Sequence, residues 1–388
     1  MQKHPVQTLA RAKNWLRDQL RPAVVVARTP MTVEHCSQDH ADQASALSQG
    51  PWQAVEVGFE WGLSYQTTWF RVRGEIPADW SGREVAMLAP VGGERTVWVD
   101  NSPFRGIDHE HEHFRIADVA TAGAVEYCIQ AYARAFHVRV WGDMPPRKER
   151  NEKVETCELL LIDSELQSLV YDYDFTLNLL EQIEETDPAR ATLLRALNQV
   201  VNLWAELGRE GLAKMRRLIR DAMGSLNRDL KHTVYPYGHA HLDTAWLWPL
   251  RITQLKMAHT TANQLYLTER YPEYVYVHSQ ASQYEWVEKQ YPALFGRIKQ
   301  AHERGQWEPV GSMWVEADCN LTGAESLIRQ FLYGRRYFAQ HFGKPTEDMF
   351  LPDVFGYSAA LPQILHKFGI KYFLTQKISW NQFNKFPH

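Results

Sequence analysis

The spacing of hydrophobic and polar residues changes along the chain, and these changes divide it into three zones. Residues 1–165 open with a helical pattern over 9–20 and continue with short apolar or alternating runs separated by turn sequences. In residues 68–73, for example, successive side chains change faces, as in a half-buried strand. Many short strands joined by turns are typical of a β-sandwich. We therefore predict a β-rich, sandwich-like N-terminal domain. The predicted strands cover residues 23–33, 65–73, 84–88, 95–99, 124–132 and 154–162.

Residues 166–231 follow a helical period. Leu169, Tyr173, Leu177 and Leu180 recur at spacings of three and four, which places them on one face of a helix. Pro188 stands where a second helix begins, a position that suits proline. This zone is predicted to be a helical connector without chemistry of its own.

Residues 232–388 alternate between strand and helix patterns. The strands recur every 30 to 40 residues or so, which is the period of βαβ units in a parallel sheet. In such sheets the functional side chains follow the carboxyl ends of the strands. The predicted strands are 233–241, 274–280, 307–315, 349–352 and 371–375, and the predicted helices are 247–268, 283–303, 324–342 and 359–368.

The end of the first predicted strand carries a candidate metal-binding pair. His239, His241 and Asp243 alternate, so they project to the same side of an extended chain. An imidazole beside a carboxylate suits a zinc-like ion, although a hydrogen-bonded pair near a loop has the same spacing. Trp246 offers either a stacking face for a ligand or a core side chain.

A second candidate follows the fourth predicted strand. Asp353 stands after an apolar run, where a buried carboxylate needs a partner. A metal held by His241 and Asp243 is one such partner. The alternative is a helix N-cap, but Ser358 is better placed for that role.

Two other strand ends carry further candidates. Glu316 and Asp318 follow the third strand and are candidate acid or base groups, or solvated loop carboxylates. His278 and Gln280 end the second strand and either line the same pocket or belong to the core.

Composition narrows the classes of protein. The net charge of −4 argues against a basic surface for nucleic acid. The chain has no apolar run of membrane-spanning length, no secretory signal, and four scattered cysteines without a disulfide pattern. We therefore expect a cytoplasmic protein that binds neither membrane nor nucleic acid.

Four motifs in order carry a family resemblance. They read GHAHLDTAWLWPL, SQASQYEW, GSMWVEADCNLTGAESLIRQFLYGRRYF and LPDVFGYSAALPQIL. Together they resemble glycoside hydrolase family 38, and within it the cytosolic-type α-mannosidases. The match is dense over residues 232–388, and residues 1–165 resemble the β-rich N-terminal region of that subgroup more weakly.

The resemblance implies a retaining α-mannosidase that removes terminal α-linked mannose from oligosaccharides through a covalent mannosyl-enzyme. It implies that His241, Asp243 and Asp353 hold a divalent metal, usually zinc, with cobalt as the alternative. It also makes Asp353 the nucleophile and Trp246 the side chain that packs against the mannose ring. His239 lies outside the ligand pattern of the family.

Further positions are less certain matches. Tyr357 stands where secretory-pathway members have histidine, a departure that marks the subgroup. A basic side chain is expected in the pocket near Lys377. The resemblance leaves the general acid unassigned, with Asp318 as a candidate.

The resemblance also raises an expectation about length. A β/α barrel needs about 250 residues, more than residues 232–388 supply. We therefore expect the N-terminal part of a truncated catalytic barrel, with a further histidine ligand beyond residue 388. An unfinished sheet edge would favour a homo-oligomer.

Two functions from other classes remain open. One is a metal-dependent amidohydrolase or polysaccharide deacetylase, for which His278 is the histidine nearest a suitable position. The other is a carbohydrate-binding fragment without catalysis.

Overall fold

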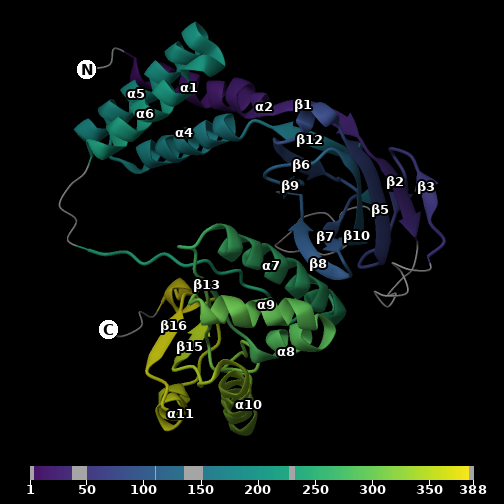
Figure 1. Ribbon diagram of the computed structural model, residues 1–388. Helices are drawn as coiled ribbons and strands as arrows, with labels where there is room; N and C mark the ends of the chain where they lie inside the picture. Colours follow the sequence, from purple (N-terminus) through teal and green to yellow (C-terminus); the bar gives the residue numbers. More distant parts are fainter. Residues whose placement is uncertain (1–3, 37–49, 110, 135–151, 227–231, 384–388) are drawn as a thin grey trace.

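The computed structural model describes residues 4–36, 50–109, 111–134, 152–226 and 232–383. Figure 1 shows a helical bundle beside a β-domain, with an α/β unit made by the C-terminal residues below them. Among the described residues, no helix combines the length and the apolar character needed to span a lipid bilayer.

Two antiparallel sheets form the β-domain and confirm the prediction of a β-rich N-terminal region. Their strand orders are β1-β12-β6-β9 and β3-β2-β5-β10-β7-β8, and a short pair, β11-β4, lies beside them. Side chains such as Phe70, Met87 and Ile129 are fully buried in the core. The strands are β1 (Val25–Pro30), β2 (Thr32–Cys36), β3 (Gln53–Val55), β4 (Glu60–Trp61), β5 (Thr67–Ile76), β6 (Glu84–Leu88), β7 (Glu94–Val99), β8 (Ser102–Ile107), β9 (His113–Ala117), β10 (Gly123–Tyr132), β11 (Glu152–Lys153) and β12 (Glu158–Ile162), with a 3₁₀ turn η2 (Ala78–Trp80).

The helical bundle joins both ends of the β-domain sequence. Trp15, from the helix that precedes the strands, packs edge-on against Tyr173 and Trp204 of the helices that follow them. Asp163 begins the first of these later helices, because its side chain accepts the N–H of Leu166. The helices are α1 (Pro5–Trp15), the π-helical η1 (Leu16–Leu20), α2 (Arg21–Ala23), α4 (Ser164–Gln182), α5 (Pro188–Leu207), the 3₁₀ turn η3 (Gly208–Gly211) and α6 (Leu212–Gly224).

The C-terminal unit alternates helices with short parallel strands, as its sequence pattern predicts. β13 pairs with β14, and β15 pairs with β16, both in parallel. The described residues form these two pairs and no closed sheet, so a complete barrel is not present in this part of the chain. The elements are α7 (Leu250–Arg270), β13 (Tyr276–His278), α8 (Ala281–Gln290), α9 (Pro292–Glu303), β14 (Trp307–Pro309), α10 (Ala324–Phe342), β15 (Asp348–Leu351), α11 (Leu361–Lys367), β16 (Tyr372–Thr375) and the 3₁₀ turn η4 (Lys377–Trp380).

Two local predictions in this unit are wrong. The strand expected at 233–241 is reduced to one parallel bridge, between Gly238 and Tyr276. The helix expected at 283–303 is two helices, because the second starts at Pro292, which has no N–H to continue the first.

Helix α7 fastens the C-terminal unit to the β-domain. The side-chain amide of Asn263 makes two hydrogen bonds to the backbone of Gly106 in β8: its oxygen accepts the Gly106 N–H at 2.9 Å, and its nitrogen donates to the Gly106 carbonyl at 3.1 Å. Lys256 donates to both carboxylate oxygens of Glu94 at 2.7 Å. The middle of α7 is therefore fastened to β7 and β8.

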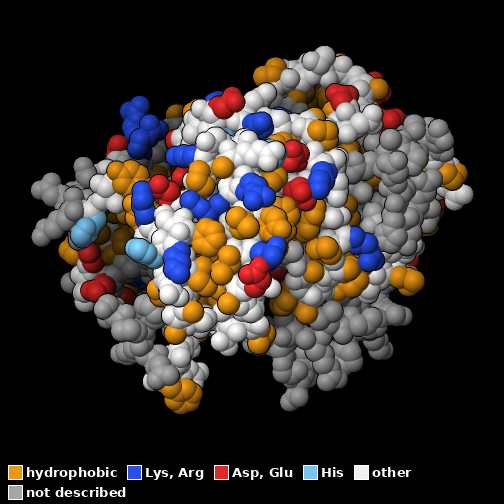
Figure 2. Space-filling model, turned by 90° about the horizontal axis from the view of Figure 1, so that it is seen from below, with side chains coloured by type: hydrophobic (Ala, Val, Ile, Leu, Met, Phe, Trp, Pro, Cys, Tyr) orange, Lys and Arg blue, Asp and Glu red, His pale blue; other side chains and the backbone are white. Residues whose placement is uncertain are grey.

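The underside of the C-terminal unit combines apolar and basic side chains. In the view from below, hydrophobic side chains gather among lysines and arginines (Figure 2). On α10, Ile328, Leu332 and Tyr333 are exposed.

Candidate active site

Chain segments that follow Gly238, β13, β14 and β15 meet around a cavity of about 240 Å³. This arrangement agrees with the expectation that functional side chains gather at strand ends. The cavity is lined by polar side chains from all four segments: His241, Asp243, Gln280, Glu316, Asp318 and Asp353.

Three of these side chains converge on one point. Nε2 of His241 lies 3.4 Å from Oδ1 of Asp243 and 3.6 Å from Oδ2 of Asp353. One ligand atom from each residue lies within 4.8 Å of the others. One imidazole nitrogen and two carboxylate oxygens form a donor set that suits zinc or a similar divalent ion. The residues present therefore fit such a metal.

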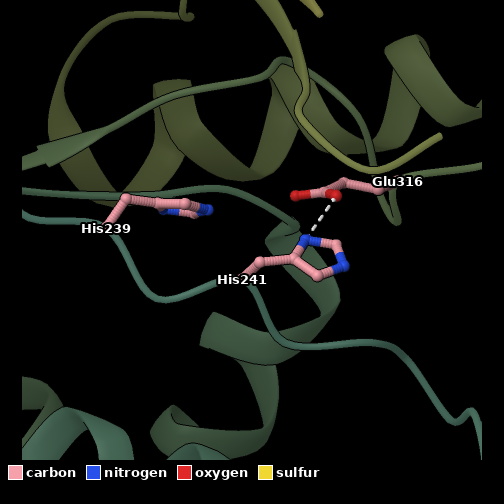
Figure 3. A group of neighbouring side chains, drawn as sticks. All are labelled: His239, His241 and Glu316. Carbon is pink, nitrogen blue, oxygen red and sulfur yellow. Dashed lines mark ion pairs between the residues drawn. The ribbon is translucent and has the colours of Figure 1, made fainter. Parts of the chain in front are cut away.

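The second nitrogen of His241 faces a different carboxylate. Nδ1 lies 3.1 Å from Oε2 of Glu316, as the dashed line in Figure 3 marks. Burial by itself would lower the pKa of His241, but the carboxylates of Asp243 and Glu316 outweigh it and raise the pKa to about 10. The surroundings of this imidazole therefore favour a positive charge.

The side chain of Asp353 pairs with a lysine and does not cap a helix. Its Oδ1 lies 2.8 Å from Nζ of Lys377, which itself stands 3.9 Å from the centre of the Trp380 ring. Helix α11 starts only at Leu361, and the Ala360 N–H donates to Ser358 Oγ at 3.2 Å. The N-cap alternative for Asp353 is therefore wrong. Lys377 pairs with Asp353 but is not among the residues that line the cavity.

The loop that carries Asp353 is fastened by Tyr357. The Tyr357 hydroxyl donates to the carbonyl of Val354 at 2.6 Å and also meets the hydroxyl of Thr375 at the end of β16. The tyrosine that marks the subgroup thus ties the nucleophile candidate's loop to the neighbouring strand.

Two buried glutamines that sequence reasoning underrated or missed hold the segments together. Gln280 accepts hydrogen bonds from Thr244 Oγ1 at 2.6 Å and from the Glu316 N–H at 3.2 Å, and donates to the carbonyl of Leu242 at 2.9 Å. Its backbone has a φ of 65°, a conformation that a non-glycine residue adopts only where its surroundings impose it. Gln283 also donates to the Leu242 carbonyl, at 2.7 Å. The identity of a residue as glutamine does not reveal a positive φ or a hydrogen-bond partner distant in the sequence. The structural roles of Gln280 and Gln283 were therefore not predictable.

Two histidines lie outside the cavity. His278 is buried and contacts Gln283 Oε1 at 3.0 Å and the Tyr276 hydroxyl at 3.3 Å. Burial lowers its pKa to about 3. Since His278 is occupied in the core, the deacetylase alternative loses the additional histidine that it needs. His239 directs Nδ1 to the carbonyl of Val277 at 3.1 Å.

Two exposed aromatic side chains lie at or near the cavity. Trp246 is 57% exposed and stands edge-on to Trp248, but it is not among the residues that line the cavity, although its neighbour Ala245 is. Phe355, 79% exposed, does line it. The sugar-stacking role of Trp246 stays a prediction, and Phe355 is an aromatic wall that sequence reasoning missed.

Comparison with known proteins now places the chain. The profile of the glycosyl hydrolases family 38 N-terminal domain matches residues 231–388, and that of the alpha-mannosidase jelly roll domain matches residues 26–160. Alpha-mannosidase 2C1 of Homo sapiens is 36% identical over 347 residues, 88% of this chain and 33% of the human protein. The chain belongs to glycoside hydrolase family 38. Its two antiparallel sheets are accordingly the jelly roll of a family 38 α-mannosidase homologue.

Other relatives agree with this family 38 assignment. Alpha-mannosidase G of Dictyostelium discoideum is 31% identical over 343 residues, 86% of this chain and 32% of that protein. The alpha-mannosidase of Saccharomyces cerevisiae is 31% identical over 367 residues, again 86% and 32%. The chain spans about a third of the length of these curated relatives. An alpha-mannosidase structure from Enterococcus faecalis V583 covers 36% of this chain and 16% of its own, with 23% identity and a TM-score of 0.34, and adds nothing to the assignment.

Proposed function

We propose that this protein is a retaining α-mannosidase that removes terminal α-linked mannose from oligosaccharides with a divalent metal in its site. The observation that carries the proposal is the convergence of His241 Nε2, Asp243 Oδ1 and Asp353 Oδ2 in one cavity. The cavity is small beside the roughly 300–1,000 Å³ of ligand pockets in general. A space of that size suits one terminal sugar ring better than an internal stretch of a chain.

The metal would be held by His241, Asp243 and Asp353, with zinc as the first choice and cobalt as the alternative. When bound, it supplies a Lewis-acid contact for sugar hydroxyls and so favours a distorted ring. The donor set of one nitrogen and two oxygens supports this choice of metal.

The covalent chemistry belongs to Asp353. Its carboxylate attacks the anomeric carbon, the bond to the leaving oxygen breaks, and water later hydrolyses the mannosyl ester, so the configuration at carbon is retained. The ammonium of Lys377 beside Oδ1 balances the negative charge of the carboxylate and orients it. Phe355 lines the cavity and would shield the sugar from water, and Trp246, next to the lining residue Ala245, is the aromatic side chain proposed to pack against the ring.

A general acid must protonate the leaving oxygen. Retaining enzymes place it about 5–5.5 Å from the nucleophile. Asp318 lines the same cavity and packs so tightly against Gly356 that a Cβ there would lie 2.7 Å from its carboxylate. However, its Oδ1 accepts the N–H groups of Asn320 and Leu321, both at 2.8 Å, which anchors the loop. Asp318 therefore remains a candidate acid. The cytoplasmic location and the homo-oligomer also stay predictions.

Hydrolysis of an aryl α-mannoside by the full chain, with Zn²⁺ or Co²⁺ added, tests the proposal. Asp353→Asn removes the nucleophile, and we expect a loss on the order of 10⁴-fold in kcat, as for other nucleophile deletions. His241→Ala removes a metal ligand, so metal analysis should show a reduced stoichiometry.

The controls separate the outcomes. Surface variant Asp79→Asn should behave as the parent chain. Activity of more than a few per cent in Asp353→Asn contradicts the nucleophile assignment. Binding of mannosides by calorimetry without turnover in the parent chain supports the carbohydrate-binding alternative instead.

A further inference from the structure

Glu316 is a buried carboxylate behind the candidate metal ligands. Its side chain is only 5% exposed, although the loop after β14 that carries it lines the cavity. Oε1 accepts a hydrogen bond from the Ser279 hydroxyl at 2.5 Å, and Oε2 lies 3.1 Å from Nδ1 of His241. Its backbone N–H is bound by Gln280. The carboxylate is thus held by one hydrogen bond at Oε1 and one ion pair at Oε2, and Gln280 holds the backbone that carries it.

The chemistry of imidazole decides what this contact does. A neutral histidine ring has one nitrogen that donates a proton and one that accepts, and the partner of the first decides which is which. An ionised carboxylate can only accept, so it requires the proton on Nδ1 of His241. The lone pair then resides on Nε2, the nitrogen that faces Asp243 and Asp353.

We propose that Glu316 is a positioning residue that sets the tautomer and the ring orientation of His241 for metal binding. The inference rests on the proposed function, because it deepens the description of that same site. Carboxylate partners of this kind make a ligating imidazole more basic and fix its direction, and their loss typically weakens metal binding 10- to 100-fold.

A second metal between His239, His241 and Glu316 is the competing reading of the same cluster. Ligand atoms of these three side chains also lie within 4.8 Å of one another (Figure 3). Such an ion would need the lone pair of Nδ1 of His241, but a neutral ring has only one lone pair to give. The Glu316 contact puts the proton on Nδ1, so the one lone pair lies on Nε2 and is available only to an ion beside Asp243 and Asp353.

Zn²⁺ affinity measured by competition with a chromogenic chelator tests the role of Glu316. Glu316→Gln keeps the shape and loses the charge, so we expect about 10-fold weaker Zn²⁺ binding, and about 100-fold for Glu316→Ala. Ser279→Ala, which releases Oε1, should give a smaller loss in the same direction. If the Glu316 variants do not fold, Ser279→Ala carries the test.

Glu84→Gln is the matched control. Glu84 is an equally buried carboxylate that accepts a serine hydroxyl, that of Ser164 at 2.6 Å, in the β-domain. Its substitution should leave Zn²⁺ affinity unchanged. In the Zn²⁺-loaded chain, the ¹⁵N resonances of His241 should report a proton on Nδ1 that the Glu316→Ala variant no longer fixes, a change that a purely structural role would not produce.

The outcomes separate failure of the proposed metal site from failure of the positioning role of Glu316. A parent chain that binds no Zn²⁺ overturns the proposed metal site itself. A parent chain that binds Zn²⁺, with Glu316→Gln, Glu316→Ala and Ser279→Ala all as tight, leaves the site standing and refutes the positioning role. A Zn²⁺ stoichiometry of two in the parent chain favours the competing second site.

Discussion

Gly106 of β8 packs directly against α7, and replacing it with alanine tests the interface between the β-domain and the C-terminal unit. A Cβ at Gly106 would fall inside the van der Waals surface of three ring atoms of His259, the Cδ2, Nε2 and Cγ atoms. The ring lies between α7 and β8, so it has little room to retreat. We therefore expect the strand and the helix to move apart to admit the methyl group.

The structure sets the size of the effect. Overpacking costs about 1–3 kcal/mol. Separation also breaks the two hydrogen bonds between Asn263 and the Gly106 backbone, worth about 0.5–1.5 kcal/mol each. We expect Gly106→Ala to lower the free energy of unfolding by about 2–6 kcal/mol, measured by urea denaturation followed by circular dichroism.

Two further variants make this result interpretable. Gly296 lies in the middle of α9 with no atom within 4 Å of an added Cβ, so Gly296→Ala should stabilise the chain by up to about 1 kcal/mol. His259→Ala combined with Gly106→Ala should recover part of the loss, because it removes the clash. Equal urea midpoints for Gly106→Ala and Gly296→Ala would refute the close-packed interface.

Two other predictions follow from side-chain contacts. Burial would raise the pKa of Glu94, but Lys256 outweighs it, and the pKa is lowered in the folded chain. The Glu94 carboxylate therefore stabilises the fold at pH values above its ordinary pKa of about 4.3. This stabilisation is lost as the pH falls through the lower pKa of the folded chain. Glu94→Gln should therefore destabilise the chain at pH 7, and the difference in urea midpoint should shrink at pH 3.5; a difference that grows in acid would contradict this sign. Tyr357→Phe removes one hydroxyl from the loop of Asp353, and should cost about 1 kcal/mol in the same assay and weaken Zn²⁺ binding. Unchanged stability and affinity would show that this loop needs no such anchor.

Much of the secondary structure followed from residue pattern alone. β6 and α10 have the predicted bounds, 84–88 and 324–342: β6 is a short apolar run buried on both faces, and α10 buries residues at helical spacing. β8 was missed: its proline and glycine weaken any strand signal, and only pairing with β7 and contact with α7 make it a strand. Tertiary contacts override local propensity at such places.

The sequence pointed to the residues that meet in the candidate site, but not to the contacts that hold them in place. Asp353 follows β15 and His241 follows the single bridge at Gly238, near the places to which parallel-sheet rules direct attention. The strand expected at 233–241 failed because Val234 and Tyr235 lie more than 80% exposed, so neither face of it is covered. The role of Gln280 depends on three long-range hydrogen bonds, which no spacing along the chain reveals.

The contact between His241 and Asp353 joins positions more than a hundred residues apart. In the unfolded chain these side chains are rarely close together, since closing so long a loop costs entropy. A cation bound there would therefore act as a reversible cross-link that exists only in the folded state. At a free concentration 100 times its dissociation constant, it would add about 2.7 kcal/mol to stability. The thermal midpoint of this protein would then depend on metal supply, and a chelator would act as a mild denaturant.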